Sequence, residues 1–229
     1  MTIQAVQAQS PEKKITSLLV TMGLKVDKAV EQAITALLDS NTHIVTGLME
    51  NAVAIQDLEL AIDQAVLASL ESGDLLSSEI RQVTSMININ KDLARLGRLA
   101  ANLGHKVTQV GEHCEHEDFS RLQPLAIAVS HLSRQTLRSL TRLDPVLARN
   151  AAGAADIIDA YRNYVFRGAP GQLAAQINDE QNIHLIFASR CLEQIADLTL
   201  NLAENLVVFL ANGLSPHSTR PDTRRPLAC

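Results

Sequence analysis

Apolar residues recur at intervals of three or four along most of the chain, the spacing of one face of an α-helix. The first such segment begins at Ser10-Pro11-Glu12, a serine cap followed by proline in the first helical position and an acid in the first turn. The same spacing predicts further helices at about 44–71, 75–110 and 119–143. A fifth is expected from the cap Asp144-Pro145 to about Arg167, and a sixth from the turn GAPG at 168–171 to ANG at 211–213. The pattern therefore predicts an all-α protein with six long helices.

The predicted helices divide into two similar halves. Segments 38–62 and 143–167 each begin with a Leu-Asp pair, and segment 91–107 aligns without a gap on 190–206. The identities are few, but two tandem three-helix bundles related by a pseudo-repeat are the simplest account. We expect the bundles at 11–113 and 114–215, between a flexible N-terminus at 1–10 and a disordered, Pro-rich tail at 216–229.

Composition supports packed helices and narrows the class of partner. Aromatic residues make up only 3% of the chain against 46% hydrophobic residues, so aliphatic side chains must build the core. The net charge of −5 disfavours nucleic acid as a partner, since a polyanion binder needs a basic face. Three cysteines without metal or redox spacing, and an N-terminus without a secretory pattern, are typical of a cytoplasmic protein. No apolar run approaches the roughly 20 residues needed to span a bilayer, so we expect no insertion into a membrane.

Acidic and amide side chains form a stripe on the last predicted helix. At 100° per residue, the members of this stripe lie within about 80° of one another, opposite the leucine-rich core face. They are Glu193, Asp197, Asn201 and Glu204. A solvated helix face explains this arrangement, and so does a cation site, because Glu193 and Asp197 are one turn apart and suit Mg²⁺, Mn²⁺ or iron. Acids of the preceding helix, Asp156 and Asp159, are able to join such a site if the two helices pack together.

The stripe also carries a resemblance to a known family. The sequence CLEQIADLTLNLAE at 191–204 resembles the last-helix signature of the PhoU regulators of phosphate transport, and LARLGR at 93–98 resembles its first-half counterpart. Residues 55–81 are similar to the second helix of that family, so the resemblance covers roughly residues 12–212. It implies a cytoplasmic and commonly dimeric regulator that restrains phosphate uptake when phosphate is plentiful. Its partners would be the ATPase subunit of a phosphate ABC transporter and a phosphate sensor histidine kinase.

In the family, a Glu/Asp-x-x-x-Asp motif in each bundle holds metal ions. The resemblance carries this role to Glu193 and Asp197, with Asp159, Asn201 and Glu204 at further matching positions. The ion would be Mg, Mn, Fe or Zn. The first half departs from the family, because Ala94 and Arg98 stand where the other motif has its acids. A metal ion is therefore expected in the second bundle only.

Two other classes of function stay open. One is a metal-storage protein or metal-dependent enzyme built on the bundle, although the chain has no Gly-rich phosphate loop, no Gly-x-Ser-x-Gly and no Glu-x-x-His, so we predict no enzyme. The other is a metal-free adaptor or dimer in which Arg98 faces the acids of a partner's second bundle. The segment GEHCEHED at 111–118 is rich in possible ligands, but its spacing fits no known zinc site and favours a solvated turn.

Overall fold

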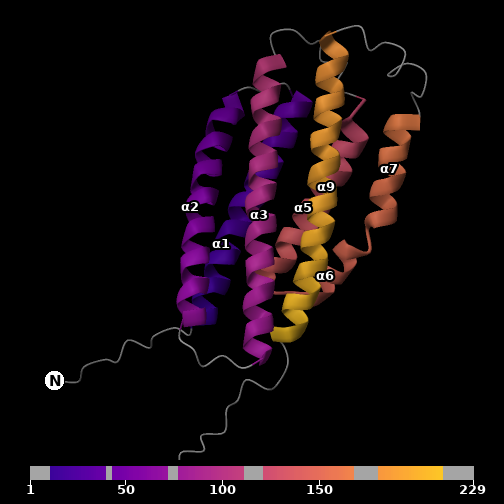
Figure 1. Cartoon of the computed structure of the whole chain (residues 1–229). Helices are drawn as coiled ribbons and strands as arrows, with labels where there is room; N and C mark the ends of the chain where they lie inside the picture. The colour runs from indigo at the N-terminus through magenta and orange to yellow at the C-terminus, as the bar shows by residue number, and fades with distance from the viewer. Residues whose placement is uncertain (1–10, 40–42, 72–76, 111–120, 168–179, 214–229) are drawn as a thin grey trace, which may run out of the picture.

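The regular structure of the described residues is entirely helical (Figure 1). The computed structural model describes residues 11–39, 43–71, 77–110, 121–167 and 180–213. The first half forms α1 (Pro11–Asp39), α2 (His43–Glu71) and α3 (Ser77–Val110). The second half forms α5 (Gln123–Arg142), α6 (Pro145–Ala152), α7 (Ala155–Arg167) and α9 (Glu180–Gly213). The all-α prediction is confirmed, and the segments predicted at 1–10, 111–118, 168–171 and 216–229 lie outside the described residues.

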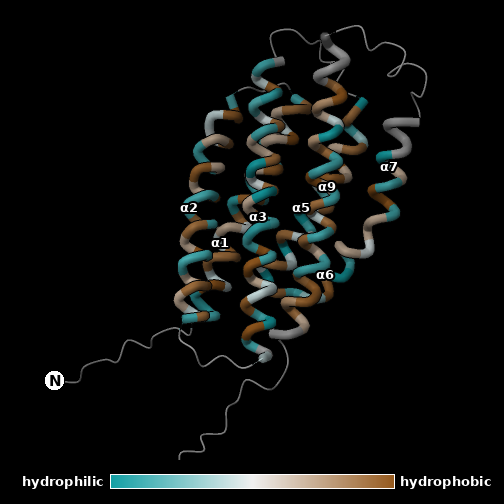
Figure 2. Tube along the Cα trace, in the orientation of Figure 1, coloured by the Kyte–Doolittle hydropathy of each residue, from teal (hydrophilic) through white to brown (hydrophobic). Residues whose placement is uncertain are grey.

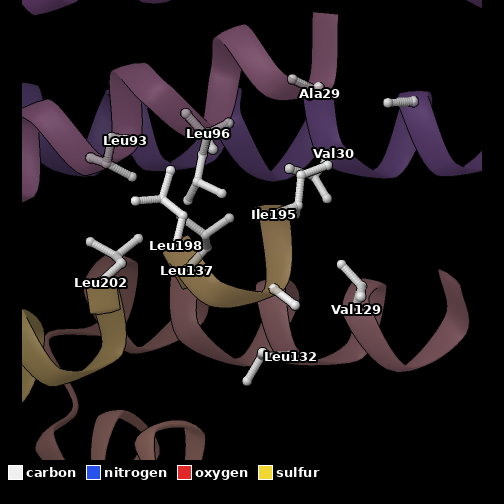
Figure 3. Packing of buried hydrophobic residues seen from close by; sticks show 14 of the residues in the cluster. Ala29, Val30, Leu93, Leu96, Val129, Leu132, Leu137, Ile195, Leu198 and Leu202 are labelled. Atoms are coloured by element: carbon white, nitrogen blue, oxygen red, sulfur yellow. The ribbon is translucent and has the colours of Figure 1, made fainter. Parts of the chain in front are cut away.

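The helices pack as two bundles that share one apolar core. In the first half α1, α2 and α3 pack against one another, and in the second half α5 packs against α6, α7 and α9. The halves meet where α3 lies along α9 and where α1 lies along α5. Figure 3 shows this junction, at which aliphatic side chains of four helices interdigitate. They include Ala29 and Val30 of α1, Leu93 and Leu96 of α3, Val129, Leu132 and Leu137 of α5, and Ile195, Leu198 and Leu202 of α9.

Two polar contacts among the described residues also cross the junction between the bundles. Arg134 Nη2 of α5 donates to Glu31 Oε1 of α1 at 2.6 Å. Asn205 Nδ2 of α9 donates a hydrogen bond to Asp92 Oδ2 of α3, 2.7 Å away. Partial burial raises the pKa of Asp92, and the hydrogen bond from Asn205 and the charge of Arg95 oppose that rise. Keeping Asp92 ionised at this junction therefore costs free energy.

The predicted fifth helix is not continuous, which corrects the expectation for 144–167. Asp144 caps α6 as predicted, since its Oδ1 accepts hydrogen bonds from the backbone N–H groups of Val146 at 2.8 Å and Leu147 at 3.2 Å. At Gly153 the helix ends, and the backbone N–H of Ala154 turns to the carbonyl of Ala151 at 3.1 Å. Glycine is among the least favourable residues in a helix interior, so the chain breaks at this point. The break lets α7 leave the axis of α6, and Figure 1 shows α7 standing at the outer edge of the second bundle.

Glycines allow α3 to approach α2 closely. A Cβ atom on Gly104 would overlap the Cδ2 atom of Leu48, and one on Gly97 would lie 3.0 Å from Ile55. Leu48 and Ile55 are buried in the core. At Gly104 a side chain on α3 would therefore force Leu48 to move, whereas at Gly97 Ile55 would have to give by only a few tenths of an ångström.

Helix α9 contains the one segment of the described residues that is long and apolar enough to cross a membrane, at Leu185–Ala211. This differs from the expectation of no such run. Half of the segment's most apolar window is buried within the protein, where it forms the core face of the second bundle. Figure 2 shows hydrophilic residues alternating with hydrophobic ones along α9, as along the other helices, which is the pattern of a helix packed on one side. Core packing accounts for the apolar character of α9.

Candidate functional site

The structure brings three of the five predicted ligands together, on α7 and α9. Glu193 and Asp197 lie one turn apart on α9, and Asp159 faces them from α7. Their side chains differ in environment: Glu193 is 13% exposed, whereas Asp197 and Asp159 are 61% and 60% exposed. Asn201 and Glu204 are exposed further along α9, and among the described residues they form no hydrogen bond or ion pair with this group.

All three carboxylates surround the guanidinium of Arg162, which also belongs to α7. Arg162 Nη1 is 3.0 Å from Asp159 Oδ1, and Nη2 donates a hydrogen bond to Asp197 Oδ1 at 2.6 Å. Arg162 Nε makes no hydrogen bond in the described part of the chain, and Glu193 Oε1 lies 4.0 Å from it. We call Asp159, Arg162, Glu193 and Asp197 the α7–α9 charge cluster.

Arg162 remains charged in this setting. Partial burial acts to lower its pKa, but the hydrogen bond to Asp197 and the charges of Asp197, Asp159 and Glu193 outweigh burial, so the pKa lies above that of an ordinary arginine. A second cation, Arg190, reaches Glu193 Oε2 from one turn earlier on α9, at 3.3 Å. Two arginines thus balance two of the three negative charges, and the sequence did not predict either arginine at this place. The spacing Asp159-x-x-Arg162 was the available signal, since residues three apart are neighbours on a helix.

As arranged, these side chains do not fit a metal ion. Within the described residues, no group of three or more His, Cys, Asp or Glu side chains is placed to hold one. The guanidinium of Arg162 occupies the position between the carboxylates that a cation would take, so an ion must first displace it. Nor is one ion able to join the whole predicted set, because eleven residues separate Glu193 from Glu204, about 16 Å along the helix axis. Metal binding by Glu193, Asp197, Asp159, Asn201 and Glu204 stays a prediction.

The first bundle has a similar ion pair with the charges exchanged between helices. Arg98 of α3 donates to Glu59 Oε2 of α2 at 2.8 Å. Beside it, the fully buried Asn90 of α3 donates to Asp63 Oδ1 at 2.9 Å and to the backbone carbonyl of Glu59 at 3.2 Å. Arg98 therefore has a partner within its own bundle, which removes the reason to pair it with the acids of a second copy. Ala94, the other departure from the family motif, is buried in the core.

Both bundles therefore carry an arginine–carboxylate pair between their second and third helical segments. In the first bundle the third helix supplies the arginine, and in the second bundle α7 supplies it. Such pairs join neighbouring helices and neutralise charge without an added ion.

Comparisons with known proteins agree with this fold. Residues 19–107 match the family of the PhoU domain. The chain is 26% identical over 220 residues to a phosphate-specific transport system accessory protein PhoU homolog of Rhizobium meliloti, covering 91% of this chain and 89% of the relative. A homolog of the same description from Pseudomonas aeruginosa is 26% identical over 205 residues, covering 87% and 83%.

Solved structures give the same result. The crystal structure of PhoU from Pseudomonas aeruginosa superposes with a TM-score of 0.80 at 25% identity, covering 90% of this chain and all of that one. The phosphate transport system regulatory protein PhoU from Streptococcus pneumoniae shares the fold, with a TM-score of 0.72 at 20% identity over 88% of this chain and 95% of that one. Residues 19–107 thus match the PhoU domain, and along about nine tenths of its length this chain is similar in sequence and in fold to proteins named PhoU.

Proposed function

We propose that the chain is a cytoplasmic, non-enzymatic regulator of phosphate uptake and of phosphate-starvation signalling. The observation that carries this proposal is the match of nearly the whole chain to proteins named as accessory to the phosphate-specific transport system. The proposed action is negative: the protein restrains uptake and starvation signalling when phosphate is plentiful. It acts by docking, with its long helices as the contact surfaces.

Two partners are proposed, the ATPase subunit of a phosphate ABC transporter and a phosphate sensor histidine kinase. The features that support docking are exposed apolar side chains along helices of both bundles, among them Leu60 of α2 and Ile157 of α7. Exposed apolar side chains of the second bundle, among them Ile157 of α7 and Val208 of α9, support a homodimer as the state of the free protein. Nucleic acid and direct membrane insertion are not part of the proposal, since the chain is acidic overall and its most apolar helix packs into the core.

Binding to the purified ATPase subunit, followed by calorimetry, tests the proposed docking. We expect saturable one-to-one binding per chain, with the negative heat-capacity change of apolar burial. The soluble part of the kinase is tested in the same way. Absence of binding to both proteins, with the chain folded by circular dichroism, would remove the docking proposal.

For metal binding, the proposal is that a divalent ion competes with the guanidinium of Arg162 for the carboxylates of the α7–α9 charge cluster. A divalent ion is proposed to bind at Glu193, Asp197 and Asp159 only when the guanidinium moves away, so the native protein holds Mg²⁺, Mn²⁺, Fe²⁺ or Zn²⁺ weakly. Elemental mass spectrometry of the native protein and of a Glu193→Ala/Asp197→Ala double variant measures this directly. A full equivalent of metal in the native protein, lost in the double variant, would contradict the competition and support a resident ion.

A further inference from the structure

The outward face of α2 carries an apolar stripe that no helix of the described structure covers. Helix α2 packs against α1 and α3 and lies at the edge of the first bundle (Figure 1). Four large apolar side chains on its outward face are between 45% and 62% exposed. They are Met49, Val53, Leu60 and Leu67. We call these four residues the α2 stripe.

The α2 stripe has the spacing of a surface that another helix covers. At 100° per residue its members fall within an arc of about 40°, so they form one narrow line rather than a scattered set. Val53, Leu60 and Leu67 are seven residues apart, the repeat that keeps an apolar seam facing a partner helix. From Met49 to Leu67 the line is about 27 Å long, five turns of helix. Single exposed leucines are ordinary on a protein surface, but four large apolar side chains aligned along five turns of one helix indicate an interface.

The charge of α2 identifies the kind of helix that fits. Helix α2 has acidic side chains on both sides of the stripe and contains no lysine or arginine. The acids are Glu50, Asp57, Glu59, Asp63 and Glu71. Glu59 is paired with Arg98, and Asp63 accepts a hydrogen bond from Asn90, so these two are already engaged with α3.

Glu50 and Asp57 remain available to a partner. Both are exposed, about 80–100° around the helix from Met49, and neither forms an ion pair with any described residue. The backbone of α1 comes close, since Asn51 Nδ2 donates to the carbonyl of Lys25 at 2.6 Å, but the side chain of Lys25 makes no ion pair with them. Flanking acids of this kind are complemented by lysine or arginine beside the apolar positions of a partner helix.

We propose that the α2 stripe docks a basic amphipathic helix of another protein. That helix carries leucine, isoleucine or methionine at heptad spacing, with lysine or arginine on the side that faces Glu50 and Asp57. A second copy of this chain is the wrong occupant, because two α2 helices side by side would bring their acids together. The acids also repel anionic lipid surfaces and nucleic acid. The inference deepens the proposed docking function and rests on it for the existence of a protein partner.

The test uses the full-length chain and a labelled synthetic peptide. The peptide is a helix of about three heptads, roughly the length of the stripe, with leucine at the a and d positions and lysine at e and g. A control peptide has glutamate at e and g. The protein variants are Leu60→Gln/Leu67→Gln in the stripe and Val208→Gln, a matched exposed apolar residue of α9. A further variant, Asp57→Lys, reverses one flanking charge.

Fluorescence anisotropy then gives the affinities. We expect the lysine peptide to bind the native chain at least about tenfold more tightly than the glutamate peptide, and the stripe variant to lose that binding. Val208→Gln should bind like the native chain, and Asp57→Lys should weaken the lysine peptide and favour the glutamate peptide. Equal binding of the two peptides, no binding of either, or equal loss in Val208→Gln would overturn the proposal.

Sedimentation equilibrium tests whether a second copy of this chain occupies the α2 stripe instead. A dimer of the native chain that dissociates in Leu60→Gln/Leu67→Gln would assign the stripe to a second copy and overturn the proposal. These measurements concern only purified protein and peptide. The peptide can therefore fail to bind while the protein still regulates phosphate uptake, and the peptide can bind even if the protein does not regulate phosphate uptake.

Discussion

Replacing Arg162 by glutamine removes the one cation of the described side chains that joins α7 to α9, and the structure sets the size of the effect. The pairs with Asp197 and Asp159 involve carboxylates that are 61% and 60% exposed, so each contributes about 0.2–1 kcal/mol. Glu193 is only 13% exposed, and losing the nearby charge leaves it with Arg190 alone. Together these losses lower the free energy of unfolding by about 1–2 kcal/mol, or about 3–6 °C in Tm for a chain of this size.

Urea unfolding followed by circular dichroism measures this change at low and high salt. A double-mutant cycle of Arg162→Gln with Asp197→Asn isolates the pair, with an expected coupling of about 0.5–1 kcal/mol that shrinks in salt. Arg190→Gln is the matched control, because Arg190 is 72% exposed and contacts only Glu193 in the cluster, so we expect less than about 0.5 kcal/mol. A coupling indistinguishable from zero, or equal effects of the two arginine variants, would refute the reasoning.

Removing Arg162 should also make the three carboxylates of the α7–α9 charge cluster available to divalent cations. In Arg162→Gln three carboxylates repel one another without a central cation, so we expect Mn²⁺ or Zn²⁺ to raise its Tm more than that of the native protein. An equal rise in both proteins would show that the guanidinium does not compete with metal.

Two further predictions concern packing and pH. Gly104→Ala should lower the Tm, since the new Cβ atom would overlap Leu48. Gly47→Ala should stabilise the protein by up to about 1 kcal/mol, because its Cβ atom would make only an ordinary contact in a helix interior. Equal shifts of the two variants in thermal melts would contradict the close approach of α2 and α3. Asp92 has a raised pKa in the folded state, so its contribution to stability is present at low pH and lost as pH rises through that pKa. Asp92→Asn should therefore raise the Tm at neutral pH, and the new amide oxygen still accepts the hydrogen bond from Asn205. The gain in Tm should fade as pH falls into the range in which an ordinary carboxyl group titrates. A gain in Tm that does not depend on pH would exclude the ionisation of Asp92 as its cause.

The helices were predictable from sequence because their apolar spacing is dictated by local geometry. Pro11 and Asp144 mark the starts of α1 and α6 as the capping rules require. The break at Gly153 was not predicted, because a single glycine is tolerated within many helices and only its setting decides whether the helix stops. That break matters for the site, since it separates α7 from α6.

The candidate site was predictable as a set of acids but not as a charge cluster. The position of Glu193 and Asp197 opposite the core follows from their spacing, and Asp159 joins them as expected for packed helices. The role of Arg162 depends on the side of α7 that meets α9, which the sequence does not define once the helix is broken. Whether a stripe of acids binds an ion or an arginine is decided by this packing, and local pattern alone does not contain it.

The most direct test of the central claim, regulation of phosphate uptake by docking, is phosphate uptake in cells that lack this protein. Uptake of radiolabelled phosphate and a starvation-induced reporter are measured in phosphate-rich medium, in the native strain, in the deletion and in the deletion complemented with the native chain. We expect uptake and the reporter to escape repression in the deletion, and the native chain to restore repression in the complemented strain. Uptake and reporter levels that stay repressed in the deletion would show that this protein does not restrain phosphate uptake.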